Sequence, residues 1–288
     1  MNKILKFCAL TAAGATVFCA NAFADSAIGQ PVQGQVGFEP AVTSIARDIH
    51  WFHNIVLMPI ITVITLFVLA LLVYVSLRFN EKRNPVPSKT THHAGLEVAW
   101  TIIPVLLLVV IAIPSFRLLS EQVNMPKADV TIKVTGNQWY WSYAYPKDQG
   151  GFGFDSMIIP AAKIDASKGE VNLLSVDNMA EVPVNKVVHL QVTGADVIHS
   201  FTVPSFGVRM DAIPGRLNQT WFKAEKEGVY FGQCSNICGQ NHAYMPIAIK
   251  VVSEDEYKAW LVTAKKQFAS NGQSPVRQAM AELPVVNQ

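Results

Sequence analysis

The chain has 288 residues, of which 50% are hydrophobic and only 15% are charged, and its formal net charge at pH 7 is +2. This composition is too apolar for an ordinary soluble protein, and the near balance of charges gives no support to nucleic-acid binding. The excess of apolar residues is concentrated in three segments near the N-terminus, which need separate interpretations.

The N-terminus has the layout of a secretory signal peptide over residues 1–24. Two lysines precede an apolar stretch at 7–20, and small residues follow up to Ala24. We expect cleavage after Ala24. A third membrane span is the alternative, but the stretch is short and only mildly apolar. Cleavage would also remove Cys8 and Cys19, so the mature chain would keep only two cysteines.

Two longer apolar segments follow, at 55–77 and 98–116, and neither contains a charged residue. Each is long enough to cross about 30 Å of hydrocarbon at about 1.5 Å per helical residue. Residues 78–94, between the two segments, contain four basic residues and one acidic residue, which favours a cytoplasmic loop. Because the signal peptide would export the N-terminus, both outer ends of the pair should face the periplasm of a bacterial inner membrane. We therefore expect a two-helix transmembrane hairpin in the lipid bilayer, with a periplasmic segment at 25–49, helices at 50–79 and 95–119, and a cytoplasmic loop at 80–94.

The pattern changes after the second apolar segment to short alternating stretches separated by Gly, Pro and Asn. This pattern predicts an all-β sandwich, which we expect to be antiparallel, within a periplasmic domain at 120–269. A terminal helix should begin at Ser253, where acidic residues face the positive end of the helix dipole. A mobile tail is expected at 270–288. The clearest strands are predicted at 130–134, 187–192, 228–231 and 247–252.

Five aromatic residues lie within seven positions at 139–145. Strand geometry would place Trp139, Trp141, Tyr143 and Tyr145 on one face. The simplest interpretation is that most of this face fills the core of the sandwich.

The most informative run begins at Cys234 and brings Cys238, His242 and Met245 within twelve residues, while His199 lies 35 positions upstream of Cys234. Thiolates, imidazoles and a thioether are ligands that copper prefers, and the run contains no carboxylate. A disulfide would explain neither the histidine nor the methionine. Structural zinc would more often show a second Cys or His pair. The run therefore predicts a copper site.

The second cysteine decides how many copper ions the site should hold. A blue mononuclear site uses one Cys with two His and a Met. Two thiolates in one tight loop can each bridge two metals, which favours a dinuclear centre. Such a centre spreads one electron over both ions and changes little on reduction, which suits electron transfer.

With these residues, the chain resembles cytochrome c oxidase subunit 2 over roughly residues 50–260. The resemblance implies that the sandwich has a cupredoxin-like fold and that a dinuclear copper A centre binds there. The family has Glu where this chain has Asn236, and the backbone carbonyl at that position is a further copper ligand. The family's Glu side chain also implies a magnesium ion shared with subunit 1, for which Asn236 offers only a neutral, weaker oxygen. The implied copper ligands are His199, Cys234, Asn236 through its carbonyl, Cys238, His242 and Met245.

The resemblance also implies a function. Electrons from cytochrome c would arrive at Trp139, pass to the copper pair and continue to haem in subunit 1, where oxygen reduction is coupled to proton translocation. Subunits 1 and 3 would be partners. Glu97, at the cytoplasmic end of the second apolar segment, would lie at the mouth of a proton path, although a solvated flank is an equally simple interpretation.

Two further sets of residues follow from the same resemblance. Asp211 and Arg216 would orient the copper loops, or form a structural salt bridge under a Pro–Gly turn. A basic cytochrome c requires an acidic docking surface, although the charges of the exported domain are balanced overall. The candidates for that surface are Asp148, Asp155, Asp177 and Asp196.

Three other functions are disfavoured by the sequence. A quinol oxidase subunit shares the membrane layout but has lost the copper ligands. Nitrous-oxide reductase has a similar copper module but needs a second large metal domain, for which this chain has no room. A membrane-tethered copper carrier would need an open, exchangeable site, whereas this loop is tight.

Overall fold

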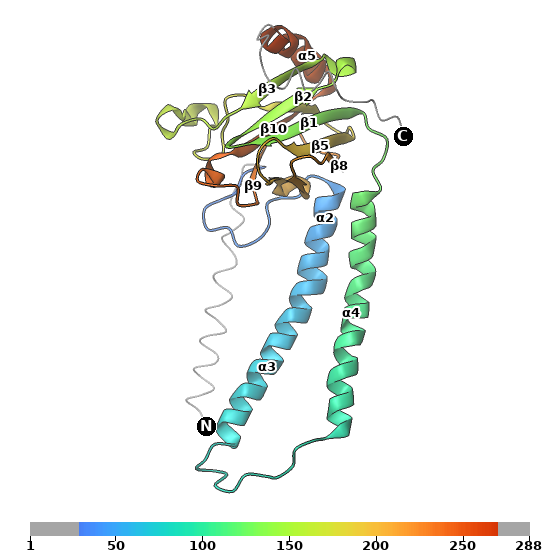
Figure 1. Cartoon of the computed structure of the whole chain (residues 1–288), viewed down its shortest axis with the longest axis vertical. Helices are drawn as coiled ribbons and strands as arrows, with labels where there is room; N and C mark the ends of the chain where they lie inside the picture. The colour runs from blue at the N-terminus through green and yellow to red at the C-terminus, as the bar shows by residue number, and fades with distance from the viewer. Residues whose placement is uncertain (1–28, 270–288) are drawn as a thin grey trace.

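The computed structural model describes residues 29–269, and two long helices stand beneath a β-sandwich in it (Figure 1). The expected signal peptide at 1–24 and the expected tail at 270–288 lie outside the described residues. Two candidate membrane helices followed by a sandwich confirm the predicted fold class of a transmembrane hairpin and an all-β domain.

The first membrane helix is continuous from Ser44 to Arg78 and the second from Ala94 to Val123, with 35 and 30 residues. At about 1.5 Å per residue they are roughly 50 and 45 Å long, more than a bilayer core requires. The extra turns extend toward the sandwich, which is why the helices start earlier and end later than the expected bounds of 50 and 119. The elements are α2 (Ser44–Trp51), the π-helical η1 (Phe52–Leu57), α3 (Met58–Arg78) and α4 (Ala94–Val123).

The start of α2 is fixed to the sandwich. Thr43 caps the helix by accepting from the backbone N–H of Ala46 at 3.0 Å, and its hydroxyl donates to the carbonyl of Phe206 at 2.8 Å. The guanidinium of Arg47 donates to both carboxylate oxygens of Glu225, at 2.6 and 2.9 Å. These contacts join the first membrane helix to the sandwich.

The end of α4 is attached to the same domain. The indole Nε1 of Trp221 donates to the carbonyl of Glu121 at 3.2 Å. The Nε2 of His189 lies 2.7 Å from the carbonyl of Pro126, in the segment that follows the helix. Both membrane helices therefore hold the sandwich in place above the bilayer.

The sandwich consists of two five-stranded sheets, with the orders β3-β2-β1-β5-β8 and β4-β10-β9-β6-β7. The expectation of a purely antiparallel sandwich is wrong, because β1 pairs with β5, and β10 with β4, in parallel. Long connections bring strands that are distant in sequence side by side, so the chain can enter neighbouring strands from the same end. The strands are β1 (Val130–Asn137), β2 (Tyr140–Tyr145), β3 (Phe152–Ser156), β4 (Ala180–Pro183), β5 (Val188–Gly194), β6 (His199–Val203), β7 (Val208–Ala212), β8 (Asn218–Phe222), β9 (Gly228–Cys234) and β10 (Pro246–Val252).

The core between the sheets is rich in aromatic side chains. Trp141, Tyr143 and Tyr145 are fully buried in it, as the period of a strand predicts. Trp139 departs from that pattern because it lies in the turn between β1 and β2 and is only partly buried. One member of the aromatic run is thus free for another role.

The predicted terminal helix is α5 (Glu254–Ala269). Ser253 precedes it, and its hydroxyl accepts from the backbone N–H of Glu256 at 3.3 Å, while the Glu256 carboxylate accepts from the backbone N–H of Ser253 at 3.3 Å. This reciprocal arrangement is a capping box. The helix packs the ring of Trp260 against Tyr145 and Phe152 at centroid distances of 5.2 and 5.6 Å.

Candidate metal centre

Two neighbouring strands and one loop supply the predicted copper ligands. His199 is the first residue of β6 and Cys234 the last residue of β9, and these strands are hydrogen-bonded neighbours. The loop from β9 to β10 carries Cys238, His242 and Met245. Because β10 lies on the other side of β9, the loop folds back over the end of the sheet and brings its side chains to His199.

The candidate donor atoms of these residues lie close together. The two sulfur atoms of Cys234 and Cys238 are 3.8 Å apart. The Cys238 sulfur lies 3.5 Å from Nδ1 of His242 and 3.5 Å from the sulfur of Met245. His199 joins both cysteines in a group whose ligand atoms all lie within 4.8 Å of one another, and all three residues are buried. The carbonyl of Asn236 is 3.3 Å from the Cys234 sulfur.

The residues fit a soft metal better than any alternative use of the same atoms. Both cysteines are free thiols, so no disulfide joins them. The Nδ1 atom of His199 is buried and has no hydrogen-bond partner. A buried polar atom without a partner is costly, and a metal ion would satisfy it.

The two thiols differ strongly in acidity. Burial opposes ionisation of Cys234, but the His199 imidazole and the backbone groups of Ser200 and Asn236 outweigh it and lower the pKa of this thiol. Burial and the nearby charge of Cys234 raise the pKa of the Cys238 thiol. One thiolate forms readily and hinders the second. A cation between them removes that hindrance, since coordination deprotonates a thiol outright.

Asp196 lies directly behind the His199 ring. Its Oδ1 is 2.8 Å from Nε2 of His199 and accepts from the backbone N–H of Val197 at 2.6 Å, while Oδ2 accepts from the backbone N–H of Gln138 at 2.7 Å. Burial alone would raise the pKa of Asp196, but these hydrogen bonds lower it. A carboxylate on Nε2 directs the Nδ1 lone pair of His199 toward the thiols. Sequence reasoning placed Asp196 only among docking residues, although its position three residues before a ligand histidine was a usable signal.

Trp139 lies against the loop between β9 and β10, which carries Cys238. Its Nε1 donates to the Cys238 carbonyl at 3.3 Å, and the side-chain amide of Gln138 donates to the same oxygen at 2.9 Å. Gly239 has a φ of 126°, and a Cβ there would approach the Trp139 ring to 2.9 Å. The indole therefore packs onto the Cys238–Gly239 peptide in a space that only glycine leaves open.

Trp141 is a second aromatic residue that contacts the candidate ligands. In the sequence, nothing distinguishes it from an ordinary core residue. Its Nε1 donates to the carbonyl of Met245 at 3.1 Å, and its ring centroid is 6.0 Å from that of His199. Gly136, which is paired with Trp141 across β1 and β2, also lies close to this ring, because a Cβ there would come within 2.8 Å of it. The imidazole thus packs against β1 and β2 and is also held by Asp196.

Asp211 and Arg216 do not form the alternative salt bridge. Both side chains are exposed, and neither takes part in an ion pair among residues 29–269. Asp211 does lie opposite Ser200, next to His199, in the pairing of β7 with β6. The carboxylate that contacts a ligand is that of Asp196.

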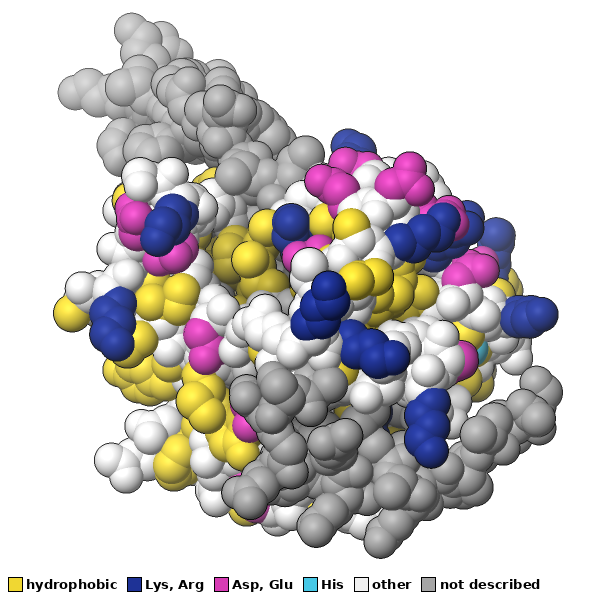
Figure 2. All heavy atoms as spheres, turned by 90° about the horizontal axis from the view of Figure 1, so that it is seen from above, with side chains coloured by type: hydrophobic (Ala, Val, Ile, Leu, Met, Phe, Trp, Pro, Cys, Tyr) yellow, Lys and Arg dark blue, Asp and Glu magenta, His cyan; other side chains and the backbone are white. Residues whose placement is uncertain are grey.

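The four candidate docking residues have three different surroundings. Burial raises the pKa of Tyr140, which is next to Trp139, and the charges of Asp155 and Asp196 raise it further. Asp148 lies just after the other end of β2. Burial raises the pKa of Tyr257 in α5, and the nearby charge of Asp148 adds to that increase. Asp177 accepts from the backbone N–H of Met157. Figure 2 shows acidic and basic side chains interspersed on the upper face, with no continuous acidic area among the described residues visible there.

Glu97 lies in the first turn of α4, where its carboxylate accepts from the backbone N–H of His93 at 3.1 Å. The Nδ1 of His93 in turn accepts from the backbone N–H of Leu96 at 3.2 Å. Glu97 therefore helps to cap the second membrane helix.

A two-span anchor, a β-sandwich and a cluster of thiols, imidazoles and a thioether define a membrane-anchored protein whose donor atoms could hold a soft metal ion. Comparisons with known proteins identify the family. Residues 31–118 match the family "Cytochrome C oxidase subunit II, transmembrane domain", and residues 130–252 match "Cytochrome C oxidase subunit II, periplasmic domain". The chain belongs to the cytochrome c oxidase subunit 2 family.

Two sequence relatives agree with this assignment. Cytochrome c oxidase subunit 2 of Cereibacter sphaeroides is 49% identical over 282 residues, which cover 92% of this chain and 92% of the relative. The probable subunit 2 of Rickettsia bellii (strain RML369-C) is 45% identical over 265 residues, covering 92% and 95%. The crystal structure of the periplasmic domain of subunit II of cytochrome oxidase of Bradyrhizobium japonicum is 60% identical, with a TM-score of 0.46, and covers 50% of this chain and 99% of that one. Membership of this family implies copper.

Proposed function

We propose that this chain accepts electrons from a cytochrome c at a dinuclear copper centre and passes them to haem in subunit 1, where oxygen is reduced and protons are translocated. The observation that carries the proposal is the joint geometry of the donor cluster and Trp139. The two thiols lie 3.8 Å apart, and the indole is hydrogen-bonded to the carbonyl of one of them. A buried metal cluster with an aromatic side chain between it and the surface suits electron transfer.

The proposed ligands are His199, Cys234, Cys238, His242 and Met245 with the Asn236 carbonyl. When two copper ions are bound, such a donor set supplies a one-electron carrier whose geometry changes little between its redox states. The chain itself holds the donors rigidly. Asp196 fixes the His199 ring, and Trp141 holds the backbone at Met245.

Trp139 is the proposed site at which electrons arrive. The link from its Nε1 to the Cys238 carbonyl joins the ring to the residue that carries a metal-binding sulfur. Asp155 and Asp196 lie near the same turn and favour a partner with a basic surface, whereas Asp148 and Asp177 would contribute only over a wider contact. Glu97 is proposed to lie at the mouth of a proton path in addition to capping its helix.

We further propose that the sandwich lies in the periplasm and that the hairpin crosses the bacterial inner membrane, beside subunits 1 and 3. The basic side chains between the membrane helices favour a cytoplasmic loop, which places the outer helix ends and the sandwich on the opposite side. Asn236 presents a neutral amide, and its Nδ2 lies 3.5 Å from the Ile198 carbonyl. A magnesium ion shared with subunit 1 would bind only weakly to such a group.

The test is metal analysis and electron paramagnetic resonance on the full chain in detergent. We expect two copper ions per chain and one unpaired electron shared between them. A single copper with a mononuclear spectrum, or zinc in its place, would contradict the proposal. Trp139→Phe should slow electron uptake from reduced cytochrome c and leave the copper spectrum unchanged. Unaltered kinetics would remove Trp139 from the path.

A further inference from the structure

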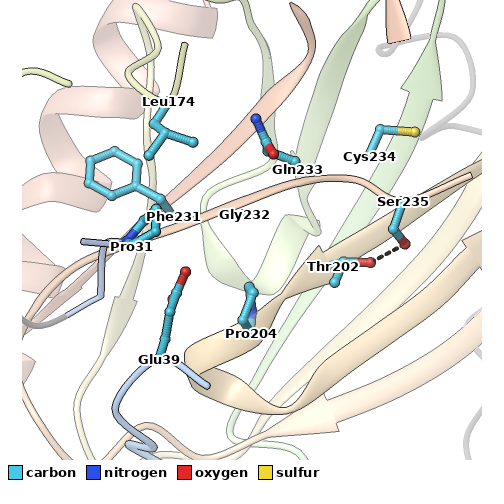
Figure 3. Close-up of a pocket in the computed structure, with 10 residues that line it drawn as sticks. All are labelled: Pro31, Glu39, Leu174, Thr202, Pro204, Phe231, Gly232, Gln233, Cys234 and Ser235. Carbon is cyan, nitrogen blue, oxygen red and sulfur yellow. Dashed lines mark hydrogen bonds between the residues drawn. The ribbon is translucent and has the colours of Figure 1, made fainter. Parts of the chain in front are cut away.

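A pocket of about 230 Å³ lies beside the metal centre, on the side of Cys234 that faces the N-terminal segment. Figure 3 shows that its walls come from three distant parts of the chain: the segment before α2, the loop before β4, and strands β6 and β9. Leu174, Phe231, Pro31 and Pro204 form apolar walls, while Gln233, Thr202 and Ser235 contribute polar groups. The hydroxyls of the last two are 2.6 Å apart.

The carboxylate of Glu39 points into this pocket (Figure 3). One of its oxygens accepts from the buried hydroxyl of Ser205 at 2.9 Å. Glu39 is partly buried and forms no ion pair within residues 29–269, whereas the partly buried carboxylate of Glu181 is paired with Lys250. Burial raises the pKa of Glu39 despite the hydrogen bond from Ser205. A carboxylate in such a place is costly without a cation.

Two large apolar side chains are exposed in the segments that adjoin β6 and β9, the strands that line the pocket. Ile237, two residues after Ser235, is 85% exposed, and Ile198 is 45% exposed. The side-chain amide of Asn236 lies 3.5 Å from the Ile198 carbonyl, so the two isoleucines flank one loop. Large exposed apolar side chains near a pocket that has both apolar and polar walls indicate contact with a protein rather than with a small ion.

We propose that this pocket receives a basic side chain, arginine or lysine, from a partner subunit that covers Ile198 and Ile237. The apolar walls suit the aliphatic stem of such a side chain, and the Glu39 carboxylate together with the two hydroxyls suits its charged end. The proposal rests on the proposed function only in requiring that the chain is one subunit of a larger oxidase. It does not depend on copper, because Glu39 supplies no atom to the donor cluster.

Carboxylate labelling tests whether the pocket is covered. The assembled oxidase and the dissociated full chain are each treated with a water-soluble carbodiimide and glycinamide, and labelling is quantified by mass spectrometry. Glu227, which is exposed and forms no ion pair among the described residues, is the matched control. Glu39 should be protected in the assembly and labelled in the free chain, while Glu227 is labelled in both. Equal labelling of Glu39 in the two states would overturn the proposal.

Substitution tests whether the charge matters. Glu39→Gln keeps the shape of the side chain and an oxygen that can accept from Ser205, so the fold should be retained. Loss of one partner of a desolvated charge pair should raise the rate at which the chain dissociates from the assembly about tenfold or more, whereas Glu227→Gln should not change it. Glu39→Asp should recover part of the loss. Protection of Glu39 combined with unchanged dissociation of the Gln variant would show a covered pocket without a basic side chain and would refute the pairing.

Discussion

Asp196→Asn tests whether the carboxylate behind His199 holds the metal centre in its geometry. The amide has the same shape but no charge, and it keeps only one acceptor oxygen. If that oxygen stays on His199 and Val197, the new NH₂ group faces the backbone N–H of Gln138, which now donates to Oδ2 at 2.7 Å. Two donors would then oppose each other. The substitution thus weakens the support of the ligand and disturbs the turn before Trp139.

The magnitude follows from the contacts. Hydrogen bonds to charged groups contribute about 1.5–3 kcal/mol, and changing a group that supports a metal ligand typically costs about 10- to 100-fold in affinity. The Asp196 side chain is 34% exposed, so water can replace part of the loss and the lower end of that range is expected. We predict about tenfold weaker copper binding, equivalent to about 1.4 kcal/mol.

The assay is competition with a copper chelator on the full chain, together with the paramagnetic resonance spectrum. Asp148→Asn is the control, because Asp148 is exposed and lies at the other end of β2. A residue that only docks the partner would alter the salt dependence of electron transfer and leave the spectrum unchanged. If the Asp196→Asn variant bound copper as tightly as the control and gave the native spectrum, the supporting role of Asp196 would be refuted.

Three further predictions follow from single contacts. Gly239→Ala should slow electron uptake more than it weakens copper binding, because the added methyl would lie 2.9 Å from the Trp139 ring at a backbone φ of 126°. The measurement is stopped-flow kinetics with reduced cytochrome c. Native rates would show that the packing of the indole is unimportant. Gly207→Ala should destabilise the junction of the first membrane helix with the sandwich by at least about 1–2 kcal/mol. The backbone φ at residue 207 is 67°, and an added Cβ would lie 2.9 Å from Cα of Ala46. An unchanged midpoint of thermal unfolding would count against a rigid junction. Ser253→Ala should lower the free energy of unfolding by about 1 kcal/mol, because it removes the N-cap of α5, and should leave the copper spectrum native. A change in the spectrum would instead show that this helix is coupled to the metal site.

The candidate donor set could be proposed from the sequence because four of its five side chains lie within twelve residues. A tight loop cannot separate them widely, so their chemistry alone indicated copper. His199 was recoverable because it opens a strand that pairs with the one ending in Cys234. The expectation of an antiparallel sandwich failed for the opposite reason. The pairings of β1 with β5 and of β4 with β10 join segments far apart in the chain, and alternation within a strand carries no information about the direction of its neighbour.

The amino-acid sequence by itself determined the membrane hairpin, the sandwich class and the donor atoms of the metal site, because each depends on local composition or short spacing. Only the tertiary structure decided what surrounds those atoms. It put the Asp196 carboxylate behind His199 and joined the Trp139 indole to the Cys238 carbonyl by a hydrogen bond. It also directed the Glu39 side chain into a pocket that, apart from Pro31, is lined by residues far from Glu39 in sequence. Most of these contacts join residues dozens to nearly two hundred positions apart, and their geometry is set by how the two sheets pack rather than by any local preference of the chain.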